Sequence, residues 1–220
     1  MNASPLPLIL LPGMGADARM FREQKKAFPQ LVVPDWIPPR RSEALVQYAH
    51  RFADVINPDT PFYLGGASFG GIIAYEMAQH LRPEALFLLA SGRSPEHMTA
   101  WLKKIRSIAH LTHVLPWDVA SLVSEIGLGL AGDKVPFSIR VILKHIQHQH
   151  TPFMKWSLHS ILRWQPSAYK HSFPMHHLHG ERDPFFSARK CGACQIIPGA
   201  GHLLTMTHHQ IVNQFIAERI

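Results

Sequence analysis

The chain has little cysteine, no long apolar run and no long run of charge. Only Cys191 and Cys194 occur among its 220 residues, whereas a fold built on disulfides uses several bridges in a much shorter chain. We therefore expect both thiols to be reduced. No apolar stretch approaches the ~20 residues that a transmembrane helix requires, so we expect no membrane-spanning segment.

Basic residues outnumber acidic ones, with 22 Lys and Arg against 15 Asp and Glu and a formal net charge of +7. The basic residues occur as scattered pairs, whereas those of a nucleic-acid-binding surface are usually clustered. We expect no nucleic-acid partner. The apolar run at 8–11 is preceded by no Lys or Arg, whereas a secretory signal begins with a basic region. We therefore expect a cytoplasmic protein.

Short apolar runs alternate with segments of helical periodicity. Strands are predicted at 8–11, 31–33, 62–64, 86–90, 175–179 and 195–197. Helices are predicted from Asp17 to about Phe28, from Ser42 to Ile56, from after Ser68 to about His80, and from His202 to Ile220. This alternation is typical of βαβ units, which build a mostly parallel sheet with helices on both faces. The fold class is α/β.

The middle of the chain differs from its flanks. From 93 to 171 the strand pattern disappears, and apolar residues such as Leu122, Val141 and Trp156 suggest several short helices. The sequence thus predicts a core made of 1–92 and 172–220, interrupted by a helical insertion at 93–171.

A glycine-rich pentad, Gly66-Ala67-Ser68-Phe69-Gly70, lies at a predicted strand-to-helix turn. Such a turn holds the serine in a strained conformation with its hydroxyl exposed above the sheet, and the flanking positions must be small because strand and helix meet closely. The pentad alone could be a phosphate cradle. Gly13-x-Gly15-x-x-Ala18 with Asp35 downstream imitates a dinucleotide fingerprint, although no P-loop motif is present.

A serine hydroxyl becomes a good nucleophile only when a base takes its proton, and that base needs an orienting carboxylate. His202 is the best base among 16 His, because it follows the last predicted strand and should share the sheet edge of Ser68. Asp183, in the loop after the preceding strand, is the favoured acid. Glu181 in the same loop is its rival, and Asp118 and Asp133 in the insertion are more remote alternatives.

Acyl transfer also needs two N–H donors for the oxyanion that forms. One candidate is the backbone N–H of Phe69, directly after the serine and at a helix N-terminus. The other is the backbone N–H of Met14, in the glycine-flanked loop after the first strand.

Together these motifs resemble the α/β-hydrolase family. The resemblance rests on Pro12-Gly13-Met14-Gly15, on the pentad around Ser68, on His179-Gly180-x-x-Asp183 and on Gly201-His202, in the family's order Ser, Asp, His. It covers about 6–92 and 172–220. Two features depart from the pattern: many relatives have His-Gly where this chain has Pro12-Gly13, and we expect the family's N-terminal antiparallel strands to be absent. We therefore expect a smaller sheet of about six strands.

The resemblance implies a serine acyl-hydrolase without metal or cofactor, similar to compact carboxylesterases and pimeloyl-carrier-protein methyl ester esterases. The insertion would be the family's variable lid. Because this insertion is rich in Leu, Ile, Trp and Phe, we expect the substrate to be a small or medium ester or thioester with an apolar acyl part. The lid aromatics either belong to the core or line an acyl pocket; they are Trp101, Trp117, Phe137, Phe153, Trp156 and Trp164. The same fold hosts lyases, C–C bond hydrolases and cofactor-free peroxidases, and a non-catalytic binding protein is a further alternative.

Cys191-Gly192-Ala193-Cys194 has the spacing of a redox or zinc motif. A thioredoxin-like site would place it at a helix N-terminus, whereas here it precedes a late strand. Zinc would need two further ligands. His177 and His179 share a face of their strand and His176 does not. We therefore expect no metal site and no redox function.

Overall fold

The computed structural model describes residues 5–109, 152–168 and 172–220. Most of the insertion predicted at 93–171 therefore lies outside the described residues. So do the side chains of Trp101, Trp117 and Phe137, and the remote acids Asp118 and Asp133.

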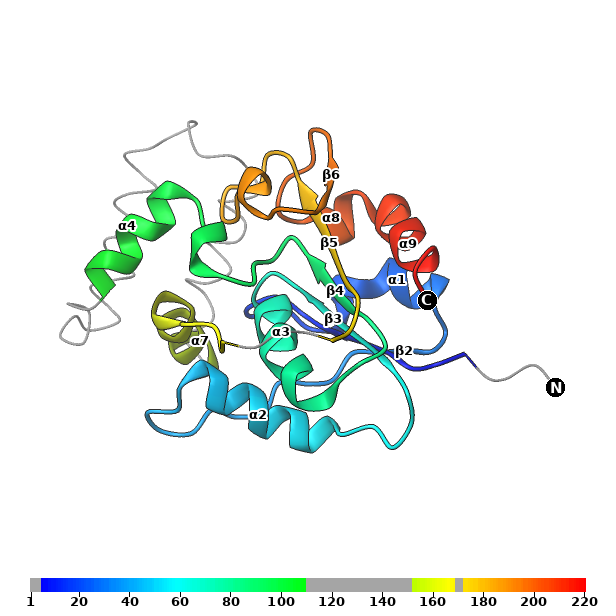
Figure 1. Ribbon diagram of the computed structural model, residues 1–220, viewed down its shortest axis with the longest axis horizontal. Coiled ribbons are helices and arrows are strands. Elements are labelled where there is room, and N and C mark those ends of the chain that lie inside the picture. Colours follow the sequence, from blue (N-terminus) through cyan, green and yellow to red (C-terminus); the bar gives the residue numbers. More distant parts are fainter. Residues whose placement is uncertain (1–4, 110–151, 169–171) are drawn as a thin grey trace.

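A single six-stranded sheet forms the centre of the molecule (Figure 1). All of its neighbouring strands are parallel, in the order β2-β1-β3-β4-β5-β6. The strands are β1 (Leu8–Leu11), β2 (Leu31–Val32), β3 (Tyr63–Ala67), β4 (Leu86–Leu89), β5 (Met175–Gly180) and β6 (Gln195–Ile197). The expected α/β fold and its sheet of about six strands are thus confirmed.

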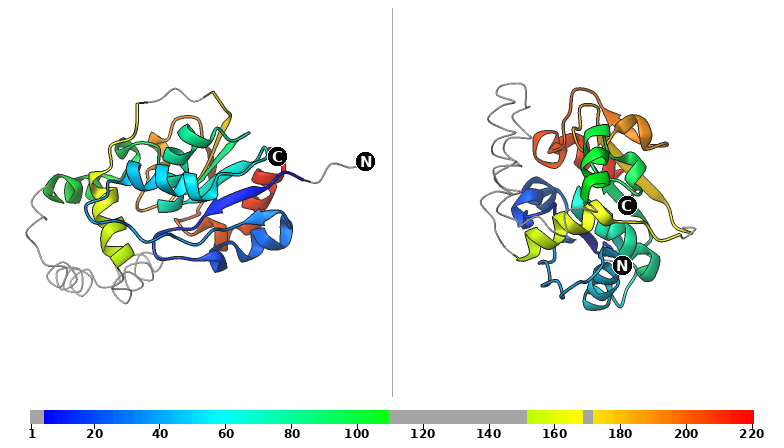
Figure 2. Two further views of the ribbon diagram at one scale, coloured as in Figure 1. Left: turned by 90° about the horizontal axis from the view of Figure 1, so that it is seen from below. Right: turned by 90° about the vertical axis from the view of Figure 1, so that its left-hand side faces the viewer.

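Helices cover both faces of this sheet (Figure 2). The α-helices are α1 (Arg22–Ala27), α2 (Leu45–Ile56), α3 (Phe69–Leu81), α4 (Ala100–Ala109), α7 (Pro152–Arg163), α8 (Leu204–Thr207) and α9 (His209–Ala217). Short 3₁₀ helices occur at η1 (Ala18–Phe21), η2 (Pro95–His97) and η4 (Ala188–Lys190).

The alternation of side chains along β1 produces two separate cores. Ile9 and Leu11 pack with α2 and α3 on one face, whereas Leu8 and Leu10 pack with α9 and with Phe21 and Phe28, which flank α1, on the other. All four side chains are buried, so β1 is apolar on both faces, as a central parallel strand must be.

Several predicted boundaries were wrong. Asp17 caps the short helix η1, and α1 follows separately. Ser42 does not cap α2: its backbone has a positive φ of 58°, and Ala44 precedes the helix instead. The predicted helix from His202 to Ile220 is divided into α8 and α9 at His208. At α2, the turn before the helix contains the residues that the prediction had assigned to its start.

The described ends of the insertion pack on the core. Trp164, which follows α7, donates its indole N–H to the buried carboxylate of Glu76 in α3 at 2.7 Å, and the Ser167 hydroxyl donates to the same carboxylate at 2.7 Å. Buried charge needs such partners. The chain therefore returns from the insertion to the core at a fixed point on α3.

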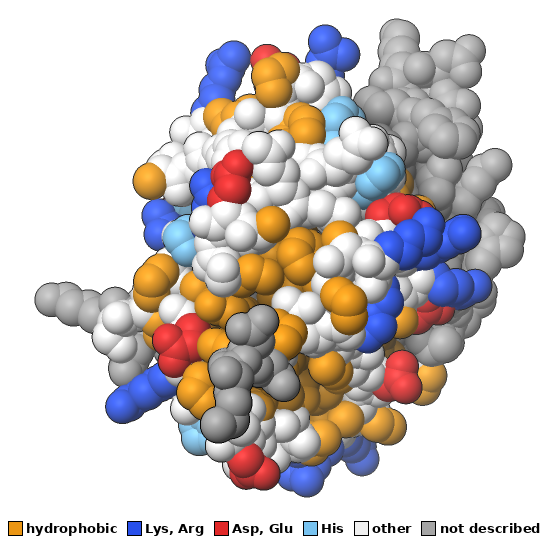
Figure 3. All heavy atoms as spheres, turned by 90° about the vertical axis from the view of Figure 1, so that its right-hand side faces the viewer, with side chains coloured by type: hydrophobic (Ala, Val, Ile, Leu, Met, Phe, Trp, Pro, Cys, Tyr) orange, Lys and Arg blue, Asp and Glu red, His pale blue; other side chains and the backbone are white. Residues whose placement is uncertain are grey.

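Among the described residues, no helix combines the length and apolarity needed to cross a membrane. Figure 3 shows one end of the molecule, where Lys and Arg side chains lie at several separate places between hydrophobic ones. On this face the positive charge is dispersed, as the scattered basic pairs of the sequence indicated.

Candidate active site

Ser68 lies in the sharp turn between β3 and α3. Its φ of 54° and ψ of −121° place it in a conformation that residues other than glycine rarely adopt. The turn is possible because its neighbours lack side chains. A Cβ on Gly66 would lie 2.4 Å from the backbone of Gly70, and one on Gly70 would lie 2.2 Å from the carbonyl oxygens of Leu11 and Pro12.

His202 and Asp183 reach this serine from two other loops at the same edge of the sheet. His202 Nε2 lies 2.8 Å from Ser68 Oγ, and His202 Nδ1 lies 2.8 Å from Asp183 Oδ2. His202 follows β6 and Asp183 follows β5. The structure therefore brings together the three side chains that the sequence singled out. In this arrangement the imidazole can take the serine proton while the carboxylate orients the imidazole.

The surroundings fix the orientation of this chain. Asp183 is 7% exposed and His202 is 6% exposed. The other carboxylate oxygen of Asp183 accepts the backbone N–H groups of Phe185 at 2.8 Å and of Phe186 at 3.1 Å. Both phenyl rings lie against the imidazole, with centroids at 4.7 Å and 6.1 Å. Asp183 thus accepts on both oxygens, the role of an ionised carboxylate.

The rival acid Glu181 points elsewhere. Its side chain is exposed and accepts the backbone N–H of Gly199 at 2.8 Å, which ties the loop after β5 to the loop after β6. No hydrogen bond joins it to His202 among the described residues.

The two proposed oxyanion donors come from segments that border the serine. Phe69 is the first residue of α3, and a first-turn N–H has no partner within its own helix. Met14 belongs to the loop after β1. That loop lies beside Ser68, since a Cβ built on Gly13 would stand 3.7 Å from Ser68 Cβ. That both N–H groups point toward the position of the oxyanion stays a prediction.

Sequence reasoning missed Ser91. This fully buried residue follows β4 and donates its hydroxyl to the carbonyl oxygen of Ser68 at 2.7 Å. The signal was available: Ser91 follows a buried strand, as Ser68, Asp183 and His202 do, and so belongs to the same edge of the sheet.

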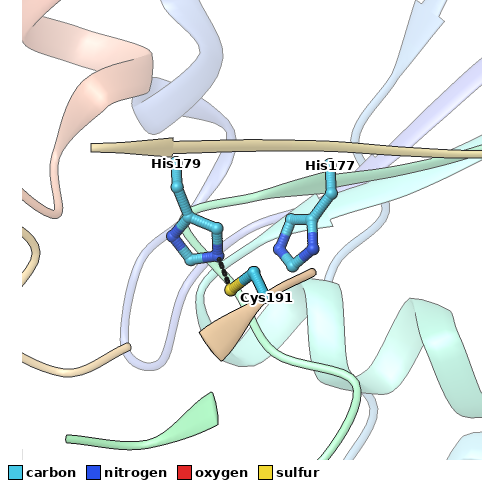
Figure 4. A group of neighbouring side chains, drawn as sticks. All are labelled: His177, His179 and Cys191. Atoms are coloured by element: carbon cyan, nitrogen blue, oxygen red, sulfur yellow. Dashed lines mark hydrogen bonds between the residues drawn. The ribbon is translucent and has the colours of Figure 1, made fainter. Parts of the chain in front are cut away.

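A second polar cluster lies next to Asp183. The sequence placed two of its members, His177 and His179, on one face of their strand, but it did not predict that Cys191 joins them. Figure 4 shows His177 and His179 of β5 side by side with Cys191. His179 Nε2 lies 2.8 Å from Cys191 Sγ, and His179 Nδ1 lies 3.9 Å from Asp183 Oδ2. Burial lowers the pKa of His177 to about 3 and lowers that of His179, and it raises the pKa of Cys191 to about 12. All three side chains are therefore neutral near pH 7.

Comparisons with solved structures show the same fold at low identity. ClbQ from the colibactin pathway is 21% identical with a TM-score of 0.64, and the match covers 98% of each chain. An esterase from Thermogutta terrifontis is 20% identical with a TM-score of 0.64, covering 98% of this chain and 89% of the other. The RedJ thioesterase from Streptomyces coelicolor is 19% identical with a TM-score of 0.62, covering 99% and 87%.

No curated protein sequence matches the chain. A family model does match, and it spans residues 8–215, which include Ser68, Asp183 and His202. The match covers all six strands of the sheet and all described helices except the last two residues of α9. The chain belongs to the alpha/beta hydrolase family.

Proposed function

We propose that the protein hydrolyses a small or medium carboxylic ester or thioester through an acyl-enzyme on Ser68. The observation that carries this proposal is the unbroken contact from Ser68 Oγ through His202 to Asp183, with both distances at 2.8 Å. Two of the structures with the same fold are described as an esterase and a thioesterase, which agrees with this choice of substrate.

In the first half of the reaction, Ser68 Oγ attacks the carbonyl carbon of the substrate while His202 Nε2 takes the hydroxyl proton. Asp183 holds the imidazole in position and stabilises its positive charge. The backbone N–H groups of Met14 and Phe69 stabilise the oxyanion of the tetrahedral intermediate. The intermediate collapses when His202 returns the proton to the leaving alcohol or thiol.

In the second half, a water molecule replaces the leaving group. His202 removes a proton from this water, whose oxygen attacks the acyl carbon, and the proton then passes to Ser68 Oγ as the acid leaves. The enzyme returns to its starting state, so no cofactor is required by this scheme.

The acyl group is proposed to be apolar, because an aromatic cluster begins next to the nucleophile. Phe69 follows Ser68, and its ring lies 5.8 Å from Trp36 and 6.2 Å from Phe153. The rings of Trp36 and Phe153 stack at 5.1 Å, and both side chains are only half-buried. Apolar pockets with a few polar groups are typical of small-molecule sites.

The experiment is to treat purified protein with a fluorophosphonate and to map the adduct by peptide mass spectrometry. We expect modification at Ser68, and we expect Ser68→Ala to lose both labelling and p-nitrophenyl ester turnover. Ser157→Ala is the matched control, because it removes another buried serine hydroxyl, and it should still be labelled. An adduct at another residue, or none on folded protein, contradicts the proposal.

A further inference from the structure

We propose that His177, His179 and Cys191 form a binding site for a transition metal ion of the Zn²⁺ class. The three side chains each offer one donor atom, and these atoms lie within 4.8 Å of one another. Ligands around a tetrahedral zinc ion stand ~2.0 to 2.3 Å from the metal and therefore ~3 to 4 Å from each other. The observed spacing needs only small side-chain adjustments to accept such an ion.

The fold itself creates this arrangement. His177 and His179 alternate with Leu178 along β5, so their side chains project from the same face of the sheet. Their ring centroids lie 4.4 Å apart. Cys191 follows η4 and reaches back to them, with its Sγ 2.8 Å from His179 Nε2. The strand and the segment after η4 thus converge on one point, as Figure 4 shows.

Burial and partners also match a metal site. The side chain of His179 is fully buried, and its Nδ1 has no hydrogen-bond partner although it lies 3.9 Å from Asp183 Oδ2. Metal-binding histidines usually direct their second nitrogen to a carboxylate or to a backbone carbonyl. In His179, Nε2 lies beside the Cys191 thiol, and Nδ1 faces the Asp183 carboxylate. In His177, Nε2 lies 2.9 Å from the carbonyl oxygen of Ser91.

The donor set determines the class of ion. Two imidazoles and one thiol suit Zn²⁺ or Cu ions, whereas Mg²⁺ and Ca²⁺ prefer oxygen ligands. Binding converts the Cys191 thiol to a thiolate and releases its proton to solvent. The cluster lies close to the surface, because Gly192 and Ala193, which follow Cys191, are exposed.

A bound ion would join β5 to the segment that follows η4. The loop that contains Asp183 lies between these two attachment points. The ion would therefore stabilise the loop that positions the proposed catalytic acid without touching the substrate. This assignment does not depend on the proposed hydrolysis, since the three ligands and their spacing are independent of what Ser68 does.

The test uses full-length protein that has been stripped with a chelator and then titrated with Co²⁺ and with Zn²⁺. We expect about one equivalent of Co²⁺ to bind with a thiolate-to-metal charge-transfer absorption, and Zn²⁺ to displace it and raise the melting temperature. Wild-type protein that binds neither ion stoichiometrically, or binds Co²⁺ without the thiolate absorption, overturns the proposal. This measurement needs no variant to fold.

Matched variants identify the ligands. Cys191→Ser and His177→Gln should each weaken Zn²⁺ binding by more than about tenfold. Loss of a residue that only supports a ligand already weakens metal binding by about tenfold or more, and these two residues are proposed as ligands themselves. Cys194→Ser, from the same motif, and His176→Gln, from the other face of the same strand, should leave it unchanged. If Cys194→Ser weakens binding as much as Cys191→Ser does, or if all four variants bind like wild type, the three-residue assignment is wrong.

Discussion

Ser91 donates its hydroxyl to the carbonyl oxygen of Ser68, the residue with the strained backbone in the β3–α3 turn, at 2.7 Å. The same carbonyl also accepts the N–H groups of Gly71 at 3.1 Å and of Ile72 at 3.3 Å. Ser91 is therefore a positioning residue that holds the turn from the side of β4.

Replacing Ser91 with alanine should reduce kcat several-fold and leave KM unchanged, because the turn keeps its backbone hydrogen bonds but loses the one from the side chain. The loss of one buried hydrogen bond should also lower the free energy of unfolding by about 1 kcal/mol. Steady-state kinetics and urea unfolding measure both effects. Ser107→Ala removes an exposed hydroxyl that bonds a helix carbonyl and is the control. Equal kcat values for the two variants would exclude the positioning role.

Asp183 and Glu181 occupy the same loop but have different partners. Asp183→Asn should lower kcat by ~10³ to 10⁴-fold, since an amide cannot hold the imidazole in the reactive tautomer. Glu181→Gln keeps an acceptor for the Gly199 N–H and should leave kcat unchanged. Comparing kcat of the two purified variants decides which acid serves His202. A large loss in Glu181→Gln with an active Asp183→Asn would reverse the assignment.

Phe153 tests the proposed apolar acyl pocket. Removing its ring should lower kcat/KM for hexanoyl esters more than for acetyl esters, because longer chains gain ~0.8 kcal/mol for each buried CH₂. A series of p-nitrophenyl esters measures this dependence. Phe28→Ala removes the same side chain from the core on the opposite face of the sheet, and it should change all acyl lengths equally. A uniform change in Phe153→Ala would place the acyl group elsewhere.

Glu43 gives a prediction for acid stability. Its carboxylate forms two hydrogen bonds with Arg51, both at 2.8 Å, and these bonds lower its pKa below the usual value of 4.5. A carboxyl with a lowered pKa stabilises the fold above its usual pKa and loses this effect as the pH falls through the folded value. The contribution of Glu43 should therefore be full at pH 7 and decline below pH 4.5.

Glu43→Gln should reduce the free energy of unfolding by about 1 kcal/mol at pH 7, because the pair is only partly screened by solvent. The difference from wild type should shrink as the pH is lowered towards 3.5. Urea unfolding at several pH values measures this difference in the free energy of unfolding. Glu84→Gln, which replaces an exposed carboxylate, is the control. A difference that grows on acidification would contradict the sign of the effect.

The sequence was most informative about residues that follow the strands of the parallel sheet, because the topology of the sheet determines where these residues lie. Ser68, Asp183 and His202 each follow a buried strand, and parallel strands end at one edge, so their proximity could be predicted without coordinates. Their catalytic roles remain a prediction. Helix starts were harder, because a short polar residue such as Ser42 caps a helix only if the preceding turn leaves it in extended conformation, and here it does not.

The cluster of His177, His179 and Cys191 could be predicted only in part. The period of two along a strand places both histidines on one face. The position of Cys191 near that face depends on the short helix η4, which directly precedes it. A periodic sequence pattern cannot predict the course of the chain through such a short helix and turn. For the same reason the relation of Cys194 to the cluster could not be derived from the spacing of the two cysteines.

The two outer strands of the sheet are unusually brief. β2 has two residues and β6 has three, although Val32 and Ile196 within them are exposed. A long bare border would offer a row of unpaired amides to which another chain could add by strand pairing. Because these outer strands are so short, an incoming strand would find few backbone groups with which to pair, and this disfavours edge-to-edge aggregation.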